Sequence, residues 1–270
     1  MPGEVPRDAG RELFGVDPAG YDRWRPSYPA GVWEVLEERC GLRAGIRALE
    51  IGSATGAATR EIAGRGASVV AVEPDARLAA FLASDAAAKG LDIEVVVSAL
   101  EDADLEPGGF DLAVAATSFH WMTDQHAALR KLFAALRPGG SWAMWWNVFG
   151  DPTRPDPFHV ATKPVIGHLG QDVTEGPVPF PLDAEARLSD LRAAGFDAPT
   201  AEEMRWTWRA TPGEVRGLYA TYSPWARLPE RERAELLDAI ERVALEEFGG
   251  LVERPFMTTI YTARRPLAGD

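Results

Sequence analysis

A carboxylate followed by closely spaced small residues is the first stretch of the chain that could bind a ligand. The stretch contains Glu50, Gly52, Ser53, Ala54 and Gly56. The apolar run before it suits a buried parallel strand, and the small residues allow a tight turn into a helix. Because the first amides of a helix lack intrahelical partners, they can approach a polar ligand closely. We therefore predict a cofactor-binding loop.

The spacing of this loop bears on which cofactor it binds. A dinucleotide fingerprint has the form G-x-G-x-x-G, whereas this loop reads E-x-G-x-A-x-G. The spacing disfavours a nucleotide-dependent oxidoreductase. A glycine-rich turn between a strand and a helix is also a common structural feature of α/β proteins, and the loop alone does not decide between these readings.

A second acid follows the next apolar run. Glu73 ends the run 68–72 and precedes Pro74 and a helical pattern over 76–89. A carboxylate at the end of a strand can accept hydrogen bonds from both hydroxyls of a ribose. Alternatively, Glu73 only favours the start of the helix, an effect worth under about 1 kcal/mol.

A third stretch brings aromatic rings and a histidine after the predicted strand 110–115. Its residues are Ala116, Thr117, Phe119, His120 and Trp121. In a doubly wound sheet, ligands bind beyond the carboxyl ends of the strands, where this stretch lies. A neutral imidazole can remove a proton from a hydroxyl, and Phe119 or Trp121 can hold a cation. A packing role for His120 is the alternative.

These motifs together resemble the class I S-adenosylmethionine (SAM) methyltransferases, in particular a small-molecule branch of the methyltransferase type 11 kind. The loop matches E/D-x-G-x-G-x-G with Ala54 as its departure, and Glu73 matches the acid after the second strand. The run F-D-L-x-V-A-A-x-x-F-H-W and the L-x-P-G-G at 136–140 extend the resemblance over roughly 20–147. Its implied cofactor is S-adenosyl-L-methionine.

The resemblance also implies a set of site residues. The cofactor is expected to contact Tyr21, Arg25, Glu50, Gly52, Ser53, Ala54, Gly56, Glu73, Pro74, Ala99, Leu100, Glu101, Ala116, Thr117 and Trp121. Among them, Arg25 would pair with the methionine carboxylate and Glu101 with the adenine amino group. A surface ion pair for Arg25 and a solvated carboxylate for Glu101 are the alternatives.

For the acceptor we predict a wall of mostly aromatic residues, with His120 as the catalytic base. The predicted acceptor residues are Tyr28, Phe119, His120, Trp146, Asn147, Tyr222 and Trp225. Core packing explains Tyr222 and Trp225 equally well. Methylation of a carboxylate needs no base, so His120 can also serve only to orient the acceptor.

The elements that position these residues alternate between strand and helix. Strands are predicted at 47–51, 68–72, 93–97, 110–115, 141–146, 202–210 and 256–263, with helices at 32–40, 56–64, 76–89, 123–136, 158–169, 184–194, 211–222 and 236–248. Such alternation predicts an α/β fold with a doubly wound, mainly parallel sheet. By the resemblance it has seven strands, with the last antiparallel beside the fifth, and helical lid elements.

Three segments are predicted along the chain. Residues 1–40 form an amino-terminal arm and lid helix, 41–147 the SAM-binding core, and 148–270 a lid segment, added helices and final strands. The arm includes the Y-x-x-x-R-P-x-Y-P motif at 21–29, which in similar methyltransferases lies over the cofactor.

Composition limits the partners. The net charge of −13 disfavours nucleic acid and anionic membranes, and it favours a small-molecule acceptor. The single cysteine, Cys40, fits a reducing cytoplasm, and no multi-cysteine metal site or other metal site is predicted. No run is long enough to span a bilayer. We expect a cytoplasmic monomer or homodimer.

Two hypotheses of function remain after these observations. The first is a SAM-dependent methyltransferase that modifies a hydroxyl or carboxylate oxygen of a small metabolite. The second is a SAM-binding protein of the same fold with a non-methylating or sensing role. Transfer of one methyl group to an acceptor would separate them.

Overall fold

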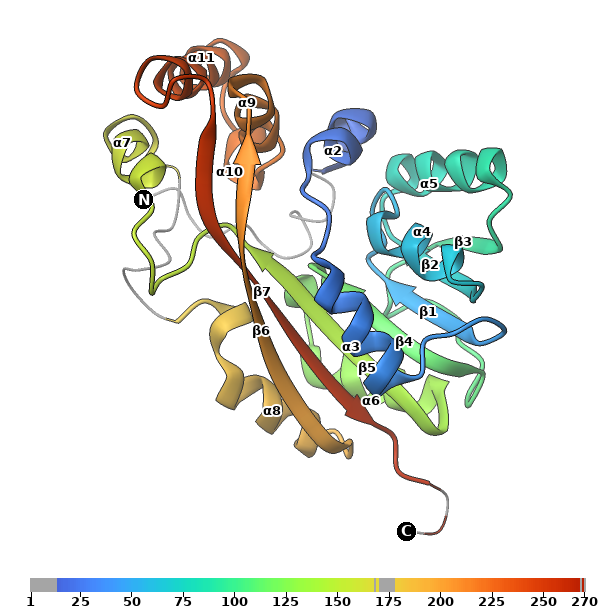
Figure 1. Ribbon diagram of the computed structural model, residues 1–270. Coiled ribbons are helices and arrows are strands. Elements are labelled where there is room, and N and C mark those ends of the chain that lie inside the picture. The colour runs from blue at the N-terminus through green and yellow to red at the C-terminus, as the bar shows by residue number, and fades with distance from the viewer. Residues whose placement is uncertain (1–13, 168, 170–177, 268, 270) are drawn as a thin grey trace.

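The computed structural model describes residues 14–167, 169, 178–267 and 269. The first thirteen residues of the predicted arm and 170–177 of the predicted lid segment lie outside the described residues. Figure 1 shows one twisted sheet with helices on both of its faces. The predicted α/β fold with a seven-stranded sheet is confirmed.

The strands are β1 (Arg47–Ile51), β2 (Ser68–Glu73), β3 (Ile93–Val97), β4 (Phe110–Ala116), β5 (Leu136–Val148), β6 (Asp197–Ala210) and β7 (Val252–Arg264). The α-helices are α2 (Pro18–Trp24), α3 (Ala30–Cys40), α4 (Ala57–Gly64), α5 (Ala76–Lys89), α6 (Gln125–Ala135), α7 (Pro157–Ile166), α8 (Ala184–Ala193), α9 (Pro212–Ala220), α10 (Ser223–Ala226) and α11 (Glu230–Glu246). Three short 3-10 helices are η1 (Phe14–Val16), η2 (Phe119–Trp121) and η3 (Phe180–Leu182).

The strand order is β3-β2-β1-β4-β5-β7-β6. The first five strands pair in parallel, and β7 lies antiparallel between β5 and β6. The order reverses between β1 and β4, which is where ligands bind in open α/β sheets. The predicted place of the last strand beside β5 is therefore confirmed.

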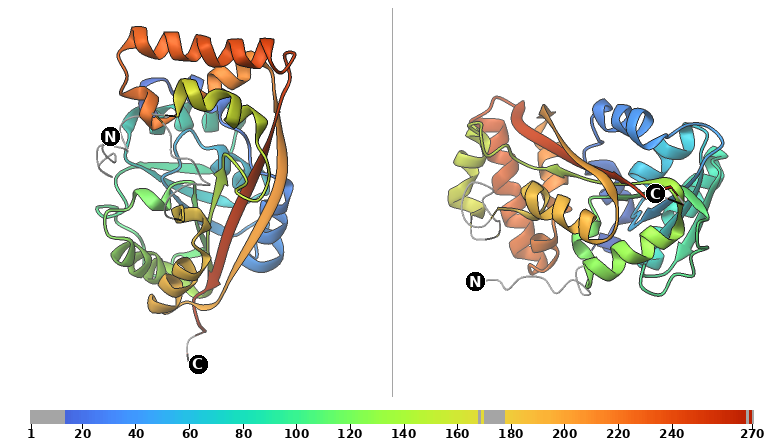
Figure 2. Two further views of the ribbon diagram at one scale, coloured as in Figure 1. Left: turned by 90° about the vertical axis from the view of Figure 1, so that its left-hand side faces the viewer. Right: turned by 90° about the horizontal axis from the view of Figure 1, so that it is seen from below.

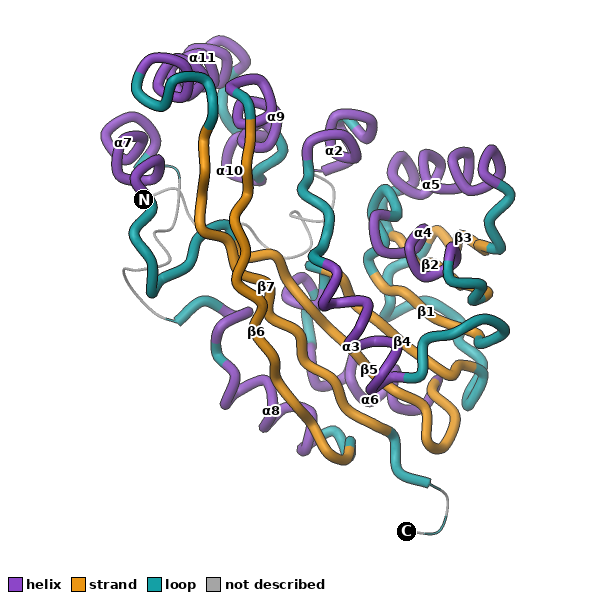
Figure 3. Tube along the Cα trace, in the orientation of Figure 1, coloured by secondary structure: helices purple, strands orange, loops and turns teal. Residues whose placement is uncertain are grey.

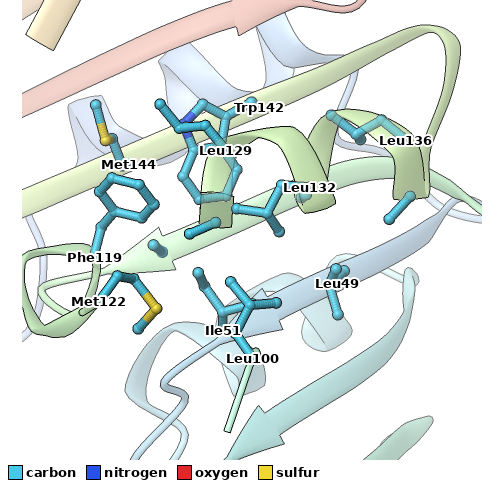
Figure 4. Close-up of a cluster of buried hydrophobic side chains, with 14 of the residues drawn as sticks. Leu49, Ile51, Leu100, Phe119, Met122, Leu129, Leu132, Leu136, Trp142 and Met144 are labelled. Carbon is cyan, nitrogen blue, oxygen red and sulfur yellow. The ribbon is translucent and has the colours of Figure 1, made fainter. Parts of the chain in front are cut away.

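Two hydrophobic cores cover the two faces of the sheet. Helices α3 and α4 pack on one face against Ala48, Leu112 and Ala143, whereas α6 and α8 pack on the other against Leu49 and neighbouring residues. Successive strand residues belong to opposite cores because side chains alternate across a strand. Figure 2 shows the two helix layers from below, and Figure 4 shows the core under α6.

Strands β6 and β7 extend beyond the rest of the sheet and support a third core. The pairing of β5 with β7 ends at Val148 and Met257, but β7 continues to pair with β6 as far as Val252 and Ala210. Figure 3 shows this extension. Helices α7, α9, α10 and α11 pack against it, and we call these four helices the cap.

Several predicted element ends differ from those observed. The strand expected at 141–146 runs over 136–148, because residues 137–140 bulge between the pairs Phe110↔Leu136 and Leu112↔Ser141. The helix expected at 236–248 begins at Glu230, since its charged first turn carries no apolar stripe. Strand β6 begins at Asp197 rather than 202, and β7 spans 252–264 rather than 256–263.

Candidate active site

The segments predicted to bind the cofactor meet at one edge of the sheet. The loop Gly52–Gly56 follows β1, Glu73 ends β2, residues 98–101 follow β3, and residues 117–121 follow β4. The carboxyl ends of these four neighbouring parallel strands point the same way. We call these segments the cofactor edge.

The loop after β1 has the backbone that its glycines permit. Gly52 and Gly56 have φ angles of 64° and 90°. A Cβ atom at Gly56 would lie 2.3 Å from a methyl carbon of Leu82, and one at Gly52 would lie 2.6 Å from Cβ of Ser118. Glycine is therefore required at both positions for conformational and steric reasons.

Ala54, the departure from the family motif, adopts the conformation of the missing glycine. Its φ angle is 48°, in the left-handed region that costs an L-residue roughly 1–2 kcal/mol. Its amide donates to Oε2 of Glu73 over 2.8 Å. The neighbouring Ser53 hydroxyl is buried and has no hydrogen-bond partner among the described residues. An unsatisfied buried hydroxyl in a glycine-rich loop fits a polar cofactor.

Glu73 is 4% exposed and holds two backbone segments together. Besides Ala54, it accepts a hydrogen bond from the amide of Asp75 over 2.9 Å. An ionised carboxylate has about four acceptor sites and can accept from hydroxyl groups such as those of a ribose. Asp75 itself caps helix α5 and pairs with Arg77.

Glu50 is a second buried carboxyl group at the loop. It is 1% exposed and accepts a 2.6 Å hydrogen bond from the Thr59 hydroxyl on α4. Burial raises the pKa of Glu50 to about 8, against the opposing effect of the Thr59 bond. Two buried carboxyl groups beside one loop favour a cationic ligand, because a positive charge would offset the cost of ionising them.

The other predicted residues of this edge are less enclosed. Glu101 is exposed, and its backbone carbonyl accepts a hydrogen bond from Lys131. Leu100 is 3% exposed within the core, so only its backbone can face a ligand. Pro74 and Ala99 are partly buried in the turns after β2 and β3.

Thr117 carries backbone strain at the end of β4. Its φ angle is 56°, which is an outlier for a β-branched residue and costs of order 1–3 kcal/mol. Its amide donates to the Trp145 carbonyl over 2.7 Å, and its hydroxyl lies 3.1 Å from the Tyr28 hydroxyl. Burial holds the pKa of Tyr28 above its ordinary value, so the phenol is neutral. The predicted cofactor residue Ala116 precedes this turn.

The arm is attached to the domain by contacts within the chain. Asp22 forms a 2.6 Å ion pair with Arg60 on α4, and Asn147 donates to the carbonyls of Pro26 and Ser27. The second side-chain atom of Asn147 accepts a hydrogen bond from Thr258. Both ends of the Asn147 amide are thus occupied by the arm and β7, and its contact with the acceptor stays a prediction.

Arg25 lies among aromatic rings. Its guanidinium donates to the Thr221 carbonyl over 2.8 Å, and its central carbon lies 4.9 Å from the ring centre of Tyr21 and 5.4 Å from that of Tyr222. The ring centres of Phe14 and Phe149 lie 5.9 and 5.5 Å from the same carbon. Arg25 forms no ion pair with any carboxylate in the described part of the chain, which differs from the surface ion pair considered above.

A line of ring contacts connects the arm with the cofactor edge. Phe14 packs edge-on against both Tyr21 and Trp121, with ring centres 5.6 and 5.8 Å apart. Tyr222 stacks on Phe149 at 5.3 Å. Phe14 and Phe149 were not predicted. Phe14 belongs to the only apolar pair in the polar residues 1–19, and this pair could have indicated a packing contact. Phe149 lies in an irregular segment whose sequence indicates no such contact.

His120 is partly buried among rings after β4. Its Nδ1 accepts a 2.9 Å hydrogen bond from the indole N–H of Trp146 on β5. The ring centres of Trp121 and Phe180 lie 4.9 and 6.4 Å from that of His120. Phe180 was not predicted either, and it reaches this place because two hydroxyls of β7, those of Thr259 and Tyr261, bind the Pro181 carbonyl.

Two predicted acceptor residues lie in hydrophobic cores instead. Phe119 is 1% exposed and packs against Trp142, as Figure 4 shows. Trp225 is 2% exposed and packs against Tyr219 in the cap. Apolar packing accounts for the burial of both rings, and their contacts with the acceptor stay predictions.

Within the residues that the structure describes, no cluster of three or more metal-binding side chains occurs. The helices of that same part of the chain include none with the length and apolar character needed to cross a bilayer.

Comparison with known proteins agrees with this geometry. Residues 48–140 match a family described as a methyltransferase domain. This match, together with relatives and solved structures that are named methyltransferases, supports a SAM-dependent methyltransferase. The chain is 27% identical over 258 residues to an uncharacterized methyltransferase of Mycobacterium tuberculosis, covering 93% of this chain and 94% of the relative. An uncharacterized methyltransferase-like protein of Schizosaccharomyces pombe is 25% identical, with 86% of each covered.

Solved structures share the fold of this methyltransferase. A Haemonchus contortus phosphoethanolamine N-methyltransferase with bound S-adenosylhomocysteine superimposes with a TM-score of 0.58 at 15% identity, over 95% of this chain and 60% of that one. The [4+2]-cyclase SpnF gives a TM-score of 0.56 at 20% identity, over 91% and 84%. Geranyl diphosphate C-methyltransferase of Streptomyces coelicolor gives 0.51 at 14% identity, over 87% and 76%.

Proposed function

We propose that this methyltransferase transfers the methyl group of SAM to an oxygen atom of a small metabolite. The observation that carries the proposal is the contrast in charge across the site. Glu50 and Glu73 are buried beside the loop, whereas the residues around Arg25 and His120 offer a cation and neutral polar groups. SAM carries a sulfonium and an ammonium group, which two carboxylates would complement.

In this proposal the cofactor edge holds SAM through backbone and carboxylate groups. Ser53 would donate its unsatisfied hydroxyl, and Glu73 would accept the ribose hydroxyls. Glu50 would face the ammonium group. The adenine would lie among Pro74, Ala99 and Leu100, with Glu101 at its outer rim.

The residues after β4 would position the reaction. When bound, SAM supplies an activated methyl on a sulfonium whose charge disappears during transfer. The Trp121 ring can stabilise that charge by cation–π attraction, worth about 0.5–2 kcal/mol. Phe14 and Phe180 would exclude water, and the contact between Thr117 and Tyr28 would hold the arm against the end of β4. Most of the rate would then come from orientation and desolvation.

The proposal also names oxygen as the atom that accepts the methyl group. By their names, two neighbours of this fold methylate nitrogen and carbon, so the fold leaves the atom open. The polar groups among the predicted acceptor residues include those of Tyr28, His120 and Tyr222, none of them acidic. An amine acceptor is a cation at neutral pH and would find no carboxylate among these groups. A hydroxyl or carboxylate oxygen accepts hydrogen bonds from them.

A second candidate function is a SAM-binding role without methyl transfer. The observation that favours it is the likeness in fold to a [4+2]-cyclase. Incubation with methyl-labelled SAM and a pooled set of small carboxylic acids and their matched alcohols separates the two. Labelled product supports methyl transfer, and base-labile label identifies a methyl ester. Label that stays in SAM, although SAM binds, supports the second candidate.

The test of the cofactor site is Glu73→Gln, because glutamine keeps an acceptor for the Ala54 amide and loses the charge. Each ribose bond to a carboxylate is worth about 1.5–3 kcal/mol. We expect S-adenosylhomocysteine affinity, measured by calorimetry, to fall at least roughly tenfold, about 1.4 kcal/mol. Glu94→Gln makes the same change at an exposed site on the adjacent strand and serves as the control. Unchanged affinity in Glu73→Gln would refute the assignment.

A further inference from the structure

The hydrogen bond between Trp146 and His120 determines which nitrogen of the histidine carries a proton. An indole N–H can only donate, so the Nδ1 atom that receives it must have a free lone pair. Neutral imidazole has one protonated nitrogen, and with Nδ1 unprotonated the proton is on Nε2. A doubly protonated ring would place two N–H groups against each other and lose the bond.

The surroundings make this arrangement persistent. Trp146 is 2% exposed, and its ring packs against Phe180 and Tyr261 at 5.4 and 6.2 Å. It lies on β5, the strand between β4 and β7. The indole therefore has little freedom to turn away, and it covers the lone pair of Nδ1.

We infer that Trp146 is a positioning residue that holds His120 as a hydrogen-bond donor at Nε2, so that His120 binds the acceptor oxygen and does not remove its proton. A general base needs an unprotonated nitrogen within reach of the acceptor. The only one on this ring faces Trp146. The inference rests on the proposed function for the identity of the acceptor, but the tautomer itself does not.

The consequence concerns the class of substrate. An acceptor oxygen that is methylated without a base at His120 is one that has already lost its proton, and a carboxylate meets this condition at neutral pH. Methyl transfer then forms the C–O bond of an ester, breaks the C–S bond, and leaves S-adenosylhomocysteine with no proton to relocate.

The first test reads the tautomer directly. The full chain is labelled with 15N-histidine and saturated with S-adenosylhomocysteine, and long-range 15N–1H correlation spectra are recorded at neutral pH. His120→Gln identifies the signals of His120. We expect a proton on Nε2 and an unprotonated Nδ1. A proton on Nδ1, or on both nitrogens, would overturn the inference, while binding of S-adenosylhomocysteine reports separately on the cofactor site.

Matched variants test the part played by Trp146. Trp146→Phe removes the indole N–H, and we expect the Nδ1-protonated form to become detectable with S-adenosylhomocysteine affinity unchanged. Trp142→Phe makes the same change four residues away on β5, where the indole N–H has no partner in the described structure, and should leave the tautomer unaltered. An unchanged tautomer in Trp146→Phe would contradict the assigned role of Trp146.

A pair of substitutions at His120 tests its role in turnover once labelled product is obtained. Glutamine can donate to the acceptor and accept from Trp146, but it is not a base. A donor role predicts that His120→Gln keeps turnover within about tenfold of the parent, whereas His120→Ala loses about 100-fold or more. Equal losses of that size in both variants would show a base and overturn the inference.

Discussion

The cofactor edge and the cap are built on different principles. At the cofactor edge, backbone amides and buried carboxyl groups are the groups proposed to bind SAM, and left-handed residues at Gly52, Ala54 and Gly56 shape the loop. In the cap, side chains hold helices together. Arg254 is 3% exposed and pairs with Asp156 at 2.8 Å, while also donating to the Phe149 carbonyl. A site made of backbone depends on local chain geometry, whereas one made of side chains depends on distant segments.

The arm contacts both the cofactor edge and the cap. Arg25 of the arm donates to Thr221, which ends α9 of the cap, and Phe14 of the arm packs on Trp121 of the cofactor edge. Contacts that join cofactor edge and cap therefore run through the arm. If the two regions are independent, a change in one should spare the other.

The largest expected effect is that of Arg254→Met on the cap. Removing one partner of a buried ion pair leaves Asp156 uncompensated, which typically costs about 3–5 kcal/mol. We expect the free energy of unfolding in urea to fall by that amount. The affinity for S-adenosylhomocysteine should change little, because the substituted residue is far from the cofactor edge.

Arg209→Met is the matched control for this substitution. Arg209 on β6 pairs with Glu253 on β7, the residue before Arg254, but the side chains are 68% and 52% exposed. Its loss should cost under about 1 kcal/mol. A large fall in cofactor affinity for folded Arg254→Met would show that cap and cofactor edge are one cooperative unit.

The next effect concerns Glu50 and the pH dependence of cofactor binding. Glu50 keeps its proton in the unliganded protein up to its pKa of about 8, and an ammonium group beside it would favour ionisation. Binding below that pH must expel the proton. We expect affinity for S-adenosylhomocysteine to rise between about pH 6 and pH 8, by at most about tenfold per unit.

Glu50→Gln should abolish this dependence, and calorimetry in buffers of different ionisation enthalpy should show that proton release is lost with it. Glu61→Gln, an exposed change on α4, should leave both unaltered.

The raised pKa of Glu50 also makes the free energy of unfolding depend on pH. The unfolded chain ionises near 4.5 while the folded carboxyl stays neutral, so the unfolding free energy of the unliganded parent should decline as pH rises from there toward 8.

A smaller effect is expected at the junction of the arm and β4. Tyr28→Phe removes the hydroxyl that lies 3.1 Å from that of Thr117. A typical hydrogen bond contributes about 0.5–1.5 kcal/mol, so unfolding free energy should fall by about 1 kcal/mol. Tyr21→Phe is the control, since the Tyr21 hydroxyl makes no hydrogen bond within the described residues. Equal losses would mean that the Thr117 contact contributes nothing.

The smallest effect is that of Ala54→Gly, which restores the family motif. Relief of left-handed strain of roughly 1–2 kcal/mol is partly cancelled by greater freedom of the unfolded chain, about 0.4–1 kcal/mol. We expect a gain in unfolding free energy of about 0.5 kcal/mol, measured by thermal unfolding. Ala44→Gly, in an exposed turn without positive φ, should instead destabilise. A loss for Ala54→Gly would contradict the assignment of strain.

Much of the cofactor edge could be predicted from the sequence because each part is local. Strand 47–51, the turn at Gly52–Gly56 and the helix after it lie within about twenty residues, and 47–51, 76–89 and 93–97 match the observed bounds. The positive φ values at Gly52 and Gly56 follow from residue type. The parallel order of the strands follows from their alternation with helices.

The acceptor side could not be predicted in the same way. Phe119 and His120 are neighbours in the chain, yet Phe119 is buried in the core whereas His120 is only partly buried and contacts Trp146, since the 3-10 turn of η2 has no periodicity that a short run reveals. Asn147 and Trp225 have the chemistry of acceptor contacts but are taken up by the arm and by the cap core.

The sequence by itself determined the residues and spacing of the loop, the acid at the end of each of the first two strands and the α/β alternation, because these depend on the local chain. Only the tertiary structure decided that Trp146 binds His120, that Arg25 lies among four rings, and that Phe180 reaches the site. The hydrogen bonds of Trp146 with His120 and of Arg25 with Thr221 join residues 26 and 196 positions apart, and local propensities carry no information about pairings over such separations.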